Sequence, residues 1–509
     1  MKTAVRLFRD TYLDSVLQLT GARAMREVDG VEWATAAMGT EGNLETMLAQ
    51  GVAAADIAEA GANHLVLAVR APDDATAAAA FAAGERAMFA AREHEAGDAT
   101  REPRSLDEAL HQQPGSTVAV VSVPGEYAAL EAHKALARGL DVLLFSDNVP
   151  VADEIALKEH AARRDRFVMG PGAGTALLGG IGLGFANAVR PGPVGVVAAA
   201  GTGAQEAMAL LDRWGVGVSQ VVGLGGRDLS EAVGGRMAAQ AIRALRDDPA
   251  TRVILLVSKP PARAVAERVL ALAGGTPFVA ALIGLAEEVT VPAGVRLADT
   301  LEGGVAAALD LLAVKPPDRG RRHGPDLDAV VARLPPARTT VRGLYSGGTL
   351  CYEALVLLGR TLGPVWSNTP LDPRHALPGP PHASVCLDLG EEEYTRGRPH
   401  PMIAPDTRVE LIREAGRDPD VAVVLLDVVL GHGAHPDPAG VLAPACADLA
   451  RPDGPQVVAY VLGTDRDPQG YRQQVCTLVE AGCVVTETAA RAALAAAAIA
   501  TRDPGRAVP

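Results

Sequence analysis

The stretch VGVVAAAGTGAQEAM, Val194–Met208, decides the fold of this chain. Its apolar first half has the length of a buried strand, and it runs through Gly201-Thr202-Gly203 into a helix. Such a strand-to-helix turn is typical of parallel α/β sheets. Its glycines let a ligand approach the backbone, and the free amides and dipole of the first helical turn favour an anion such as phosphate or carboxylate.

A second copy of this turn occurs later in the chain. Gly201–Ala207 and Gly348–Ala354 both read Gly-Thr-x-x-x-Glu-Ala, and Gly347 precedes the second copy. Each copy is followed by a helix end, an Asp-Pro stop and a buried strand, at Arg246–Val257 and at Gly416–Asp427. One glycine turn needs no ligand to explain it, but two turns with the same Thr and Glu favour an internal repeat of two anion-binding modules.

Charge and cysteine content restrict the kinds of partner. The net charge of -14, with no Lys/Arg cluster beyond Arg319–Arg322, argues against a nucleic-acid partner. The five cysteines are odd in number and lack CxxC spacing, so we expect a reducing compartment, the cytosol. The N-terminal stretch is charged and no apolar run reaches the length of a membrane span, so we expect neither an export signal nor a membrane anchor.

Length and periodicity predict several domains. A chain of 509 residues exceeds the size of a single hydrophobic core, which stops growing near roughly 250–300 residues. Strands and helices alternate along most of it, which predicts an α/β protein with tandem doubly wound parallel-sheet domains and a small α+β N-terminal domain. The expected divisions are residues 1–110 for the small domain, 111–190 for a Rossmann-type domain, 191–315 for the first repeat module, 316–340 for a charged, proline-rich linker and 341–509 for the second module.

The repeat resembles a known enzyme family. Val194–Met208, with GPGAGT before it and VVGLGGRDLSEAVGG after it, resembles the CoA-ligase module of the succinyl-CoA synthetase α subunit. The residues from Val123 to Ala161 resemble the CoA-binding domain of that subunit, although the usual N-terminal glycine-rich turn is not evident. The C-terminal half resembles a second ligase module, so the resemblance implies tandem flavodoxin-type ligase domains after a CoA-binding-like domain.

A closer resemblance covers nearly the whole length. It is carried by the motifs SVPGEYAA, FSDNVP, GLGFAN, GGRDLSEAVGG, GLYSGGTLCYEA and GEEEYTRGRPHPMIAP, which resemble the FdrA family. That family is labelled acyl-CoA synthetase, but its better functional link is to a carbamoyltransferase that acts on oxamate in allantoin degradation, a branch of purine degradation, together with two other subunits. Many members of that family have Asp-Cys where this chain has Gly172-Ala173, which weakens a chemical role for this loop.

The residues give less support to an acyl-CoA synthetase than to a carbamoyltransferase. Succinyl-CoA synthetases carry a phosphoryl group on a histidine that follows the first ligase turn, but this chain has no histidine between His160 and His323. A phosphohistidine relay in the first module is therefore unsupported. No GxxxxGK[ST] phosphate loop is present either, so ATP and CoA enter only if the chain is a ligase.

The second module concentrates polar residues. The segment after its turn holds Glu391–Glu393, Arg396, Arg398 and His400, and His432 follows the buried strand that ends near Asp427. The carboxyl end of a parallel strand is the usual place of a site in α/β sheets. A solvated charged loop explains the glutamates better than a functional role does, whereas the apolar flanks of His432 favour a functional role.

Carbamoyl transfer needs three kinds of group. A phosphate cradle fits Gly201-Thr202-Gly203 or Gly347-Gly348-Thr349, a cation for the acceptor carboxylate fits Arg227, Arg398 or Arg408, and a donor to the carbamoyl carbonyl, or a general base, fits His400 or His432. Glu206 and Glu353 match the glutamate that faces the phosphohistidine in the synthetases, so the resemblance implies a catalytic role for them, while favourable placement near a helix N-terminus is the simpler explanation.

Three functions stay open on the sequence alone. The first is a carbamoyltransferase subunit that uses carbamoyl phosphate and oxamate, or cleaves oxalurate with phosphate; the second is an acyl-CoA ligase; the third is a non-catalytic ligand-binding subunit. No Asp/Glu/His cluster has metal-ligand spacing, so we expect no protein-held catalytic metal and only a Mg²⁺ that arrives with substrate. Two partner subunits are expected from the resemblance, and a homo-oligomer stays open.

Overall fold

The computed structural model divides the chain into two units, each described by itself below. One comprises residues 1–104 with Glu392–Pro399, and the other comprises residues 105–391 and 400–509. The described residues are 2–13, 15–94, 103–285, 288–396 and 398–507.

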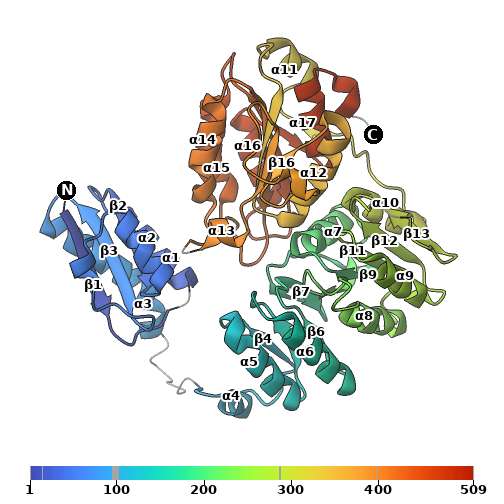
Figure 1. The fold of residues 1–509 in the computed structure, drawn as a ribbon, viewed down its shortest axis with the longest axis horizontal. Coiled ribbons are helices and arrows are strands. Elements are labelled where there is room, and N and C mark those ends of the chain that lie inside the picture. Colours follow the sequence, from blue (N-terminus) through green and yellow to red (C-terminus); the bar gives the residue numbers. More distant parts are fainter. Residues whose placement is uncertain (1, 14, 95–102, 286–287, 397, 508–509) are drawn as a thin grey trace. The chain divides into compact units, whose positions relative to one another are not determined.

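An antiparallel sheet with helices on both faces forms the first unit (Figure 1). Its elements are β1 Lys2–Phe8, α1 Ser15–Arg26, β2 Trp33–Met38, α2 Glu41–Ala49, the 3-10 turn η1 Ala54–Asp56, β3 Leu65–Ala71, α3 Asp74–His94 and the short α13 Glu392–Thr395. The strand order is β1-β3-β2. Successive residues of β3 face opposite sides, so Leu65 and Leu67 pack with α1 and α3, whereas Val66 and Ala68 pack with α2. The sequence predicted a small α+β N-terminal domain, which this arrangement confirms.

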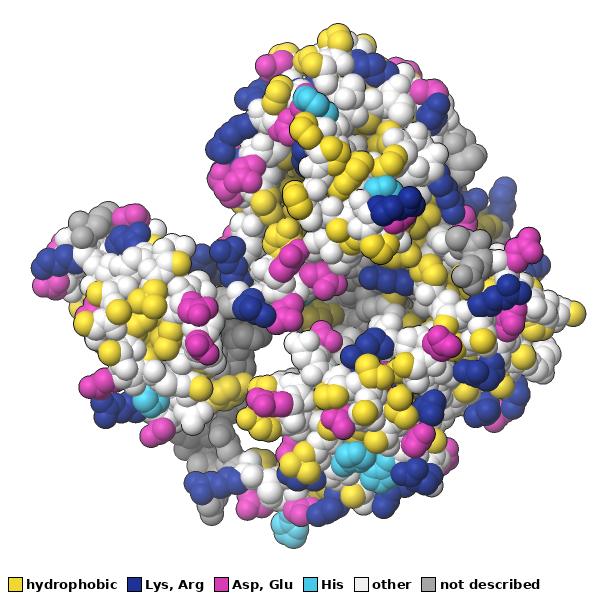
Figure 2. Space-filling model, in the orientation of Figure 1, with side chains coloured by type: hydrophobic (Ala, Val, Ile, Leu, Met, Phe, Trp, Pro, Cys, Tyr) yellow, Lys and Arg dark blue, Asp and Glu magenta, His cyan; other side chains and the backbone are white. Residues whose placement is uncertain are grey.

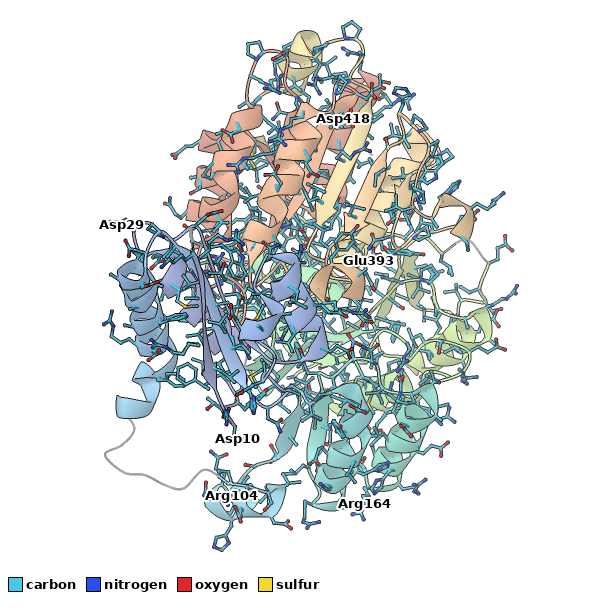
Figure 3. All side chains as sticks on the ribbon, turned by 60° about the vertical axis from the view of Figure 1, so that its left-hand side comes forward. Asp10, Asp29, Arg104, Arg164, Glu393 and Asp418 are labelled. Carbon is cyan, nitrogen blue, oxygen red and sulfur yellow. The ribbon has the colours of Figure 1, made fainter. Side chains whose placement is uncertain are left out.

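A small parallel sheet begins the second unit. Its elements are α4 Leu106–Gln112, β4 Val118–Val121, α5 Gly125–Ala137, β5 Asp141–Leu144, α6 Val151–Arg163 and β6 Val168–Met169. The strand order is β4-β5-β6 with all strands parallel, as the apolar runs separated by helices predicted. In Figure 3, Arg164 marks the end of α6.

The first repeat module is a seven-stranded sheet. Its elements are β7 Thr175–Leu178, β8 Ile181–Gly184, β9 Pro191–Ala198, α7 Gly201–Arg213, β10 Val218–Gly223, α8 Arg236–Asp247, β11 Val253–Ser258, α9 Arg263–Leu270, η2 Ala271–Ala273, β12 Phe278–Leu282, β13 Val295–Ala298 and α10 Leu301–Leu311. The strand order is β13-β12-β11-β9-β10-β7-β8, in which β9 to β13 are parallel and the β7-β8 hairpin is antiparallel. This hairpin extends the sheet although it falls within the range 111–190 expected for the preceding domain.

The second module repeats this plan. Its elements are β14 Arg322–His323, α11 Leu327–Arg333, β15 Thr340–Tyr345, α12 Gly348–Leu362, β16 Trp366–Ser367, η3 Pro373–His375, β17 Val385–Asp388, η4 Pro405–Arg408, α14 Val409–Arg417, β18 Val421–Val429, α15 Pro438–Leu449, β19 Gln456–Leu462, α16 Tyr471–Glu480, β20 Val484–Thr486, α17 Ala489–Thr501 and η5 Pro504–Ala507. The order is β14-β20-β19-β18-β15-β17-β16. In chain order, β10-β9-β11-β12-β13 and β17-β15-β18-β19-β20 both read 2-1-3-4-5, the flavodoxin-like doubly wound order.

The stretch expected to be a linker, residues 316–340, belongs to the second module. Its strand β14 pairs with β20, and its helix α11 buries Leu327 and Val330. Many of the charged side chains of this stretch are exposed, but Arg338 is 7% exposed and donates to the backbone carbonyls of Asp418, Val421 and Asp453.

The described surface carries charges of both signs. On the face drawn in Figure 2, Lys and Arg side chains are interspersed with Asp and Glu side chains. Among the helices in the described ranges, none has the length and apolar character needed to cross a bilayer.

Two buried glutamates connect the modules reciprocally. Glu353 on α12 accepts the amide of Leu301, the first residue of α10, at 2.7 Å. Glu206 on α7 accepts the hydroxyl of Tyr460 at 2.5 Å, and the amide of Ala489, the first residue of α17, also faces this carboxylate. Each module therefore supplies one glutamate carboxyl group to the other module. This group lies at the start of that module's last long helix, which is α10 in the first module and α17 in the second. Burial raises the pKa of Glu206 to about 7 and that of Glu353 to about 8.

These raised pKa values predict that the folded state loses stability as the pH rises. The unfolded chain releases both protons near pH 4.5, whereas the folded chain keeps them until about pH 7 and pH 8, so stability falls between about pH 5 and 8. Glu353→Gln keeps an acceptor for Leu301 and cannot ionise, so its melting temperature should fall less over this range. Thermal unfolding at pH 5, 6, 7 and 8 measures this, with exposed Glu410→Gln as the matched control. Equal slopes for wild type and Glu353→Gln would contradict the assignment.

Candidate functional site

The two repeat turns meet in one cleft of about 400 Å³ at the carboxyl ends of the parallel strands. Gly201 and Thr202 at the start of α7 line it together with Gly348 and Thr349 at the start of α12. The Thr349 amide donates a hydrogen bond of 3.2 Å to the Thr202 hydroxyl, so the two helix N-termini are in contact. In sheets of this order, ligands bind at the carboxyl ends of the strands where the strand order reverses. In Figure 3, Asp418 marks the opposite, amino-terminal end of β18.

The first turn is open. Gly201 is exposed, no side chain caps α7, and a Cβ at Gly201 would meet only the Thr175 hydroxyl, at 4.0 Å. Within the described ranges, no protein acceptor is recorded for the amides of Gly201, Thr202 and Gly203. Amides at the start of a thirteen-residue helix without an acceptor form a cradle for an anion.

The second turn is closed by carboxylates. Asp427 accepts the amides of Ser346 and Gly347 at 2.8 and 2.7 Å. Asp388 lies so close to Gly348 that a Cβ there would be 2.3 Å from its Oδ2 atom. Two carboxylates occupy the positions where an anion would approach α12, so the two copies of the repeat are chemically different.

Strand register explains this difference. Val197 pairs with Leu256 in the first module, and the equivalent Leu344 pairs with Leu426 in the second. The next position is then Val257 in one module and Asp427 in the other. Two positions further, Lys259 in the first module corresponds to Val429 in the second. The first module thus combines an open turn with a cation, and the second buries a carboxylate beneath its turn.

Lys259 is a cleft residue that sequence reasoning missed. It directly follows β11, lines the cleft, and places its ammonium 5.3 Å from the centre of the Tyr352 ring. Among the described lining residues it is the only Lys or Arg. The sequence signal that could have identified Lys259 is a polar residue directly after a fully buried strand. The same signal drew attention to His432.

His400 lies in the cleft, as expected, but in one protonation state. Its Nδ1 atom accepts the Met402 amide at 3.2 Å, which places the ring proton on Nε2. Burial lowers the pKa of His400 to about 4. The imidazole is therefore neutral near pH 7 and presents a hydrogen-bond donor at Nε2, which favours the role of donor over that of general base, the two roles that the sequence left open for His400.

Asp388 is a second missed residue. It ends β17, is 3% exposed and lines the same cleft. Burial raises the pKa of Asp388 to about 6, opposed by the charge of Lys259. A carboxylate with such a pKa can exchange a proton near neutral pH. Phe145 and Asp147, from the small parallel sheet, form another side of the cleft.

The three arginines expected to bind a substrate carboxylate do not line the cleft. Arg408 is 1% exposed and bonds Asp427 at 2.9 Å, so it supports the second turn from beneath. Arg227 bonds Glu154, which also pairs with the buried Lys158, and so it holds the small parallel sheet to the first module. Arg398 is exposed and belongs to the other unit.

The remaining expected residues lie outside the cleft lining. His432 is exposed and its amide bonds the carbonyl of Ala186 at 2.8 Å. Glu206 and Glu353 point into the intermodule contact rather than toward a ligand. Gly203 and Gly347 serve close approach of the modules, because a Cβ at either would lie within 3.0 Å of the threonine side chain of the opposite turn. Within the described ranges, no group of three or more His, Cys, Asp or Glu side chains is arranged to hold a metal ion.

Family models match both ends of the chain. Residues 344–499 match the CoA-ligase model, and residues 1–104 match the model described as "AllF, heavy metal-associated domain". Residues 1–104 contain no cysteine, since the five cysteines are Cys351, Cys386, Cys446, Cys476 and Cys483. The side chains of this unit therefore do not fit a thiolate site for a heavy metal.

Partial similarity extends to CoA-linked enzymes. The succinate–CoA ligase [ADP-forming] α subunit of Staphylococcus aureus is 30% identical over 159 residues, covering 30% of this chain and 51% of that protein. Among solved structures, ATP citrate lyase from Methanothrix soehngenii is 20% identical with a TM-score of 0.31, covering 41% of this chain and 37% of that one.

One relative matches over the whole length. The Escherichia coli (strain K12) protein YahF is 37% identical over 510 aligned residues, covering 97% of this chain and 98% of that protein. This match, the CoA-ligase domain and the AllF-type N-terminal domain agree with the motifs found in the sequence. The chain belongs to the FdrA family of succinyl-CoA synthetase-like proteins.

Proposed function

We propose that the chain is a subunit of a carbamoyltransferase that moves a carbamoyl group between carbamoyl phosphate and oxamate, and so cleaves oxalurate with phosphate in allantoin degradation. The observation that carries the proposal is the open first turn, where Gly201 and Thr202, whose amides have no protein acceptor within the described ranges, line one cleft with Lys259.

Phosphate binding falls to the first module. The amides of α7 and Lys259 together provide donors and positive charge for a phosphate dianion. The second turn does not compete for this anion, because Asp388 and Asp427 already lie against it. This assigns the phosphate to Gly201–Gly203 rather than to Gly347–Thr349.

The remaining groups fit the transfer step. In the direction of oxalurate synthesis, the oxamate nitrogen attacks the carbamoyl carbon, the bond from this carbon to the phosphate oxygen breaks, and the nitrogen loses a proton. The Nε2–H group of His400 is suited to polarise the carbamoyl oxygen, and Asp388 is suited to take the proton. In the reverse direction phosphate attacks oxalurate, and Asp388 returns the proton to the departing oxamate.

A phosphohistidine relay is disfavoured by His400. A relay needs a ring nitrogen with a free lone pair facing the phosphate. In this cleft Nδ1 accepts a backbone amide and the proton is on Nε2. Such an imidazole donates to a ligand rather than attacking phosphorus.

An acyl-CoA ligase is the second candidate, favoured by the likeness to the succinate–CoA ligase α subunit and by the CoA-ligase family match. The two activities differ in what they consume. With both partner subunits present, oxamate-dependent phosphate release from carbamoyl phosphate without ATP supports the transferase. CoA-dependent ATP consumption on a carboxylate, without that release, supports the ligase, and ligand binding without turnover in either assay supports a non-catalytic subunit.

Removing the cleft cation should weaken phosphate binding. A charge-assisted hydrogen bond contributes about 1.5–3 kcal/mol, so Lys259→Met should raise the Kd of carbamoyl phosphate by roughly 10- to 100-fold. Isothermal titration calorimetry on the full chain measures this. Lys134→Met, at an ammonium that pairs with Glu131 on the surface, is the matched control and should change the Kd by less than about 2-fold. An unchanged Kd in Lys259→Met would remove this lysine from the site.

Ionisation of Asp388 should determine how kcat/KM for oxamate depends on pH on the acidic side of the profile. Because its pKa is raised to about 6, kcat/KM for oxamate should rise as the pH increases from 5 to 7 and then level off. Asp388→Asn should lower kcat and abolish the rise near pH 6, whereas Asp448→Asn, at an exposed carboxylate on α15, should keep it. A profile of Asp388→Asn that still rises near pH 6 would assign the step to another group.

A further inference from the structure

Gln205 is a buried polar residue of the cleft that takes no part in the carbamoyl transfer as proposed. It lies on α7, is 1% exposed and lines the cleft. It follows Gly201 by one helical turn, so the two residues share a face of the helix and are separated by roughly 6 Å along its axis. Long side chains on a helix lean toward its N-terminus. The Gln205 side chain is therefore directed toward the turn that is proposed to bind phosphate.

The hydrogen bonds of Asn187 fix the orientation of the Gln205 amide. The Asn187 Nδ2 atom donates to the Leu430 carbonyl at 3.0 Å and to Asp467 at 2.8 Å, which uses both of its hydrogens. The Asn187 Oδ1 atom is therefore the atom that faces Gln205, and it accepts a long hydrogen bond of 3.5 Å from Gln205 Nε2. Because Gln205 presents its nitrogen to Asn187, its Oε1 atom points away from this contact.

The Oε1 atom of Gln205 is an acceptor that a ligand can use. Within the described ranges, no donor to this atom is recorded, and the atom is not among those that are sealed from solvent without a partner. The side chain borders the cleft, so a ligand bound there can reach this oxygen. An acceptor in a nearly buried side chain is costly to leave unpaired. A ligand that places an N–H group against Oε1 is therefore favoured.

The second copy of the repeat lacks this acceptor. Its residue at the same position is Tyr352, whose ring contacts the Lys259 ammonium with 5.3 Å between this nitrogen and the ring centre. Tyr352 is not among the described residues that line the cleft. The amide acceptor, the open turn and Lys259 therefore all belong to the first module.

We propose that Gln205 determines the donor substrate of the cleft by accepting a hydrogen bond from the NH₂ group of carbamoyl phosphate. This inference rests on the proposed function, because it places the phosphate of that substrate at Gly201–Gly203. An acetyl group has nearly the same size as a carbamoyl group but carries CH₃ in place of NH₂. Acetyl phosphate would leave Oε1 without a donor and would exclude water from it. The cleft therefore selects carbamoyl phosphate over acetyl phosphate.

Comparison of these two acyl phosphates on the same protein tests the proposal. In isothermal titration calorimetry on the full chain, the Kd of acetyl phosphate should exceed that of carbamoyl phosphate by about 10-fold, because only the carbamoyl group satisfies the acceptor. Gln205→Met keeps the length of the side chain and removes the amide, so the ratio of the two Kd values should fall to about 1, with the Kd of inorganic phosphate unchanged. Gln473→Met, at an exposed glutamine on α16, is the matched control and should keep the wild-type ratio. A purely structural role of Gln205 would change both Kd values together and leave their ratio as it is.

Either of two results would overturn the proposal. The first is equal binding of acetyl phosphate and carbamoyl phosphate by the wild-type chain, which decides the question even if Gln205→Met does not fold. The second is a wild-type ratio in folded Gln205→Met. Neither result affects the proposed function, which oxamate-dependent phosphate release tests separately. A wild-type chain that binds no carbamoyl phosphate would remove both.

Discussion

The contact between the two repeat modules is the constraint on which the rest of the second unit depends. The modules meet through the starts of α7 and α12, where the Thr349 amide bonds the Thr202 hydroxyl. Glu206 and Glu353 then reach across in opposite directions, each to the start of the last long helix of the other module. A side chain at Gly203 or Gly347 would separate the helices, so the glycines of the repeat serve this contact as much as they serve a ligand.

The two similar turns differ in the groups that lie against them. Because both turns open onto the same cleft, two anions bound there would repel each other. The second module carries Asp427 at the position where the first has Val257, and this carboxylate occupies the amides of its own turn. The first module carries Lys259 instead, and its amides stay free. The cleft therefore has a positive side at Lys259 and a carboxyl group at Asp388, and in the proposed reaction this carboxyl group takes a proton from the amide nitrogen of oxamate.

The sequence predicted the fold well, because continuous apolar runs of strand length, glycine turns and Asp-Pro stops are local signals. It also identified both copies of the turn, and it singled out His400, which lines the cleft. It could not identify Lys259 or Asp388 as partners, because they lie far apart in the chain and only the sheet order brings them to one cleft. It assigned Arg408 to a substrate because charge alone does not reveal burial, whereas the structure pairs this arginine with Asp427.

The charged stretch around residues 316–340 also shows that local sequence signals do not reveal contacts between residues far apart in the chain. Proline and charge are local indicators of a linker, but pairing of β14 with β20 depends on a strand far along the chain. The AllF-type N-terminal unit likewise keeps an antiparallel sheet without the cysteines that its family description would lead one to expect.

The central claim is that the first turn, and not the second, holds the phosphate. A crystal structure of the full chain determined with carbamoyl phosphate or inorganic phosphate bound tests it most directly. The account predicts a phosphate within hydrogen-bond distance of the Gly201–Gly203 amides and of the Lys259 ammonium. A phosphate bound instead at Gly348 and Thr349, with Asp388 and Asp427 displaced, would contradict it.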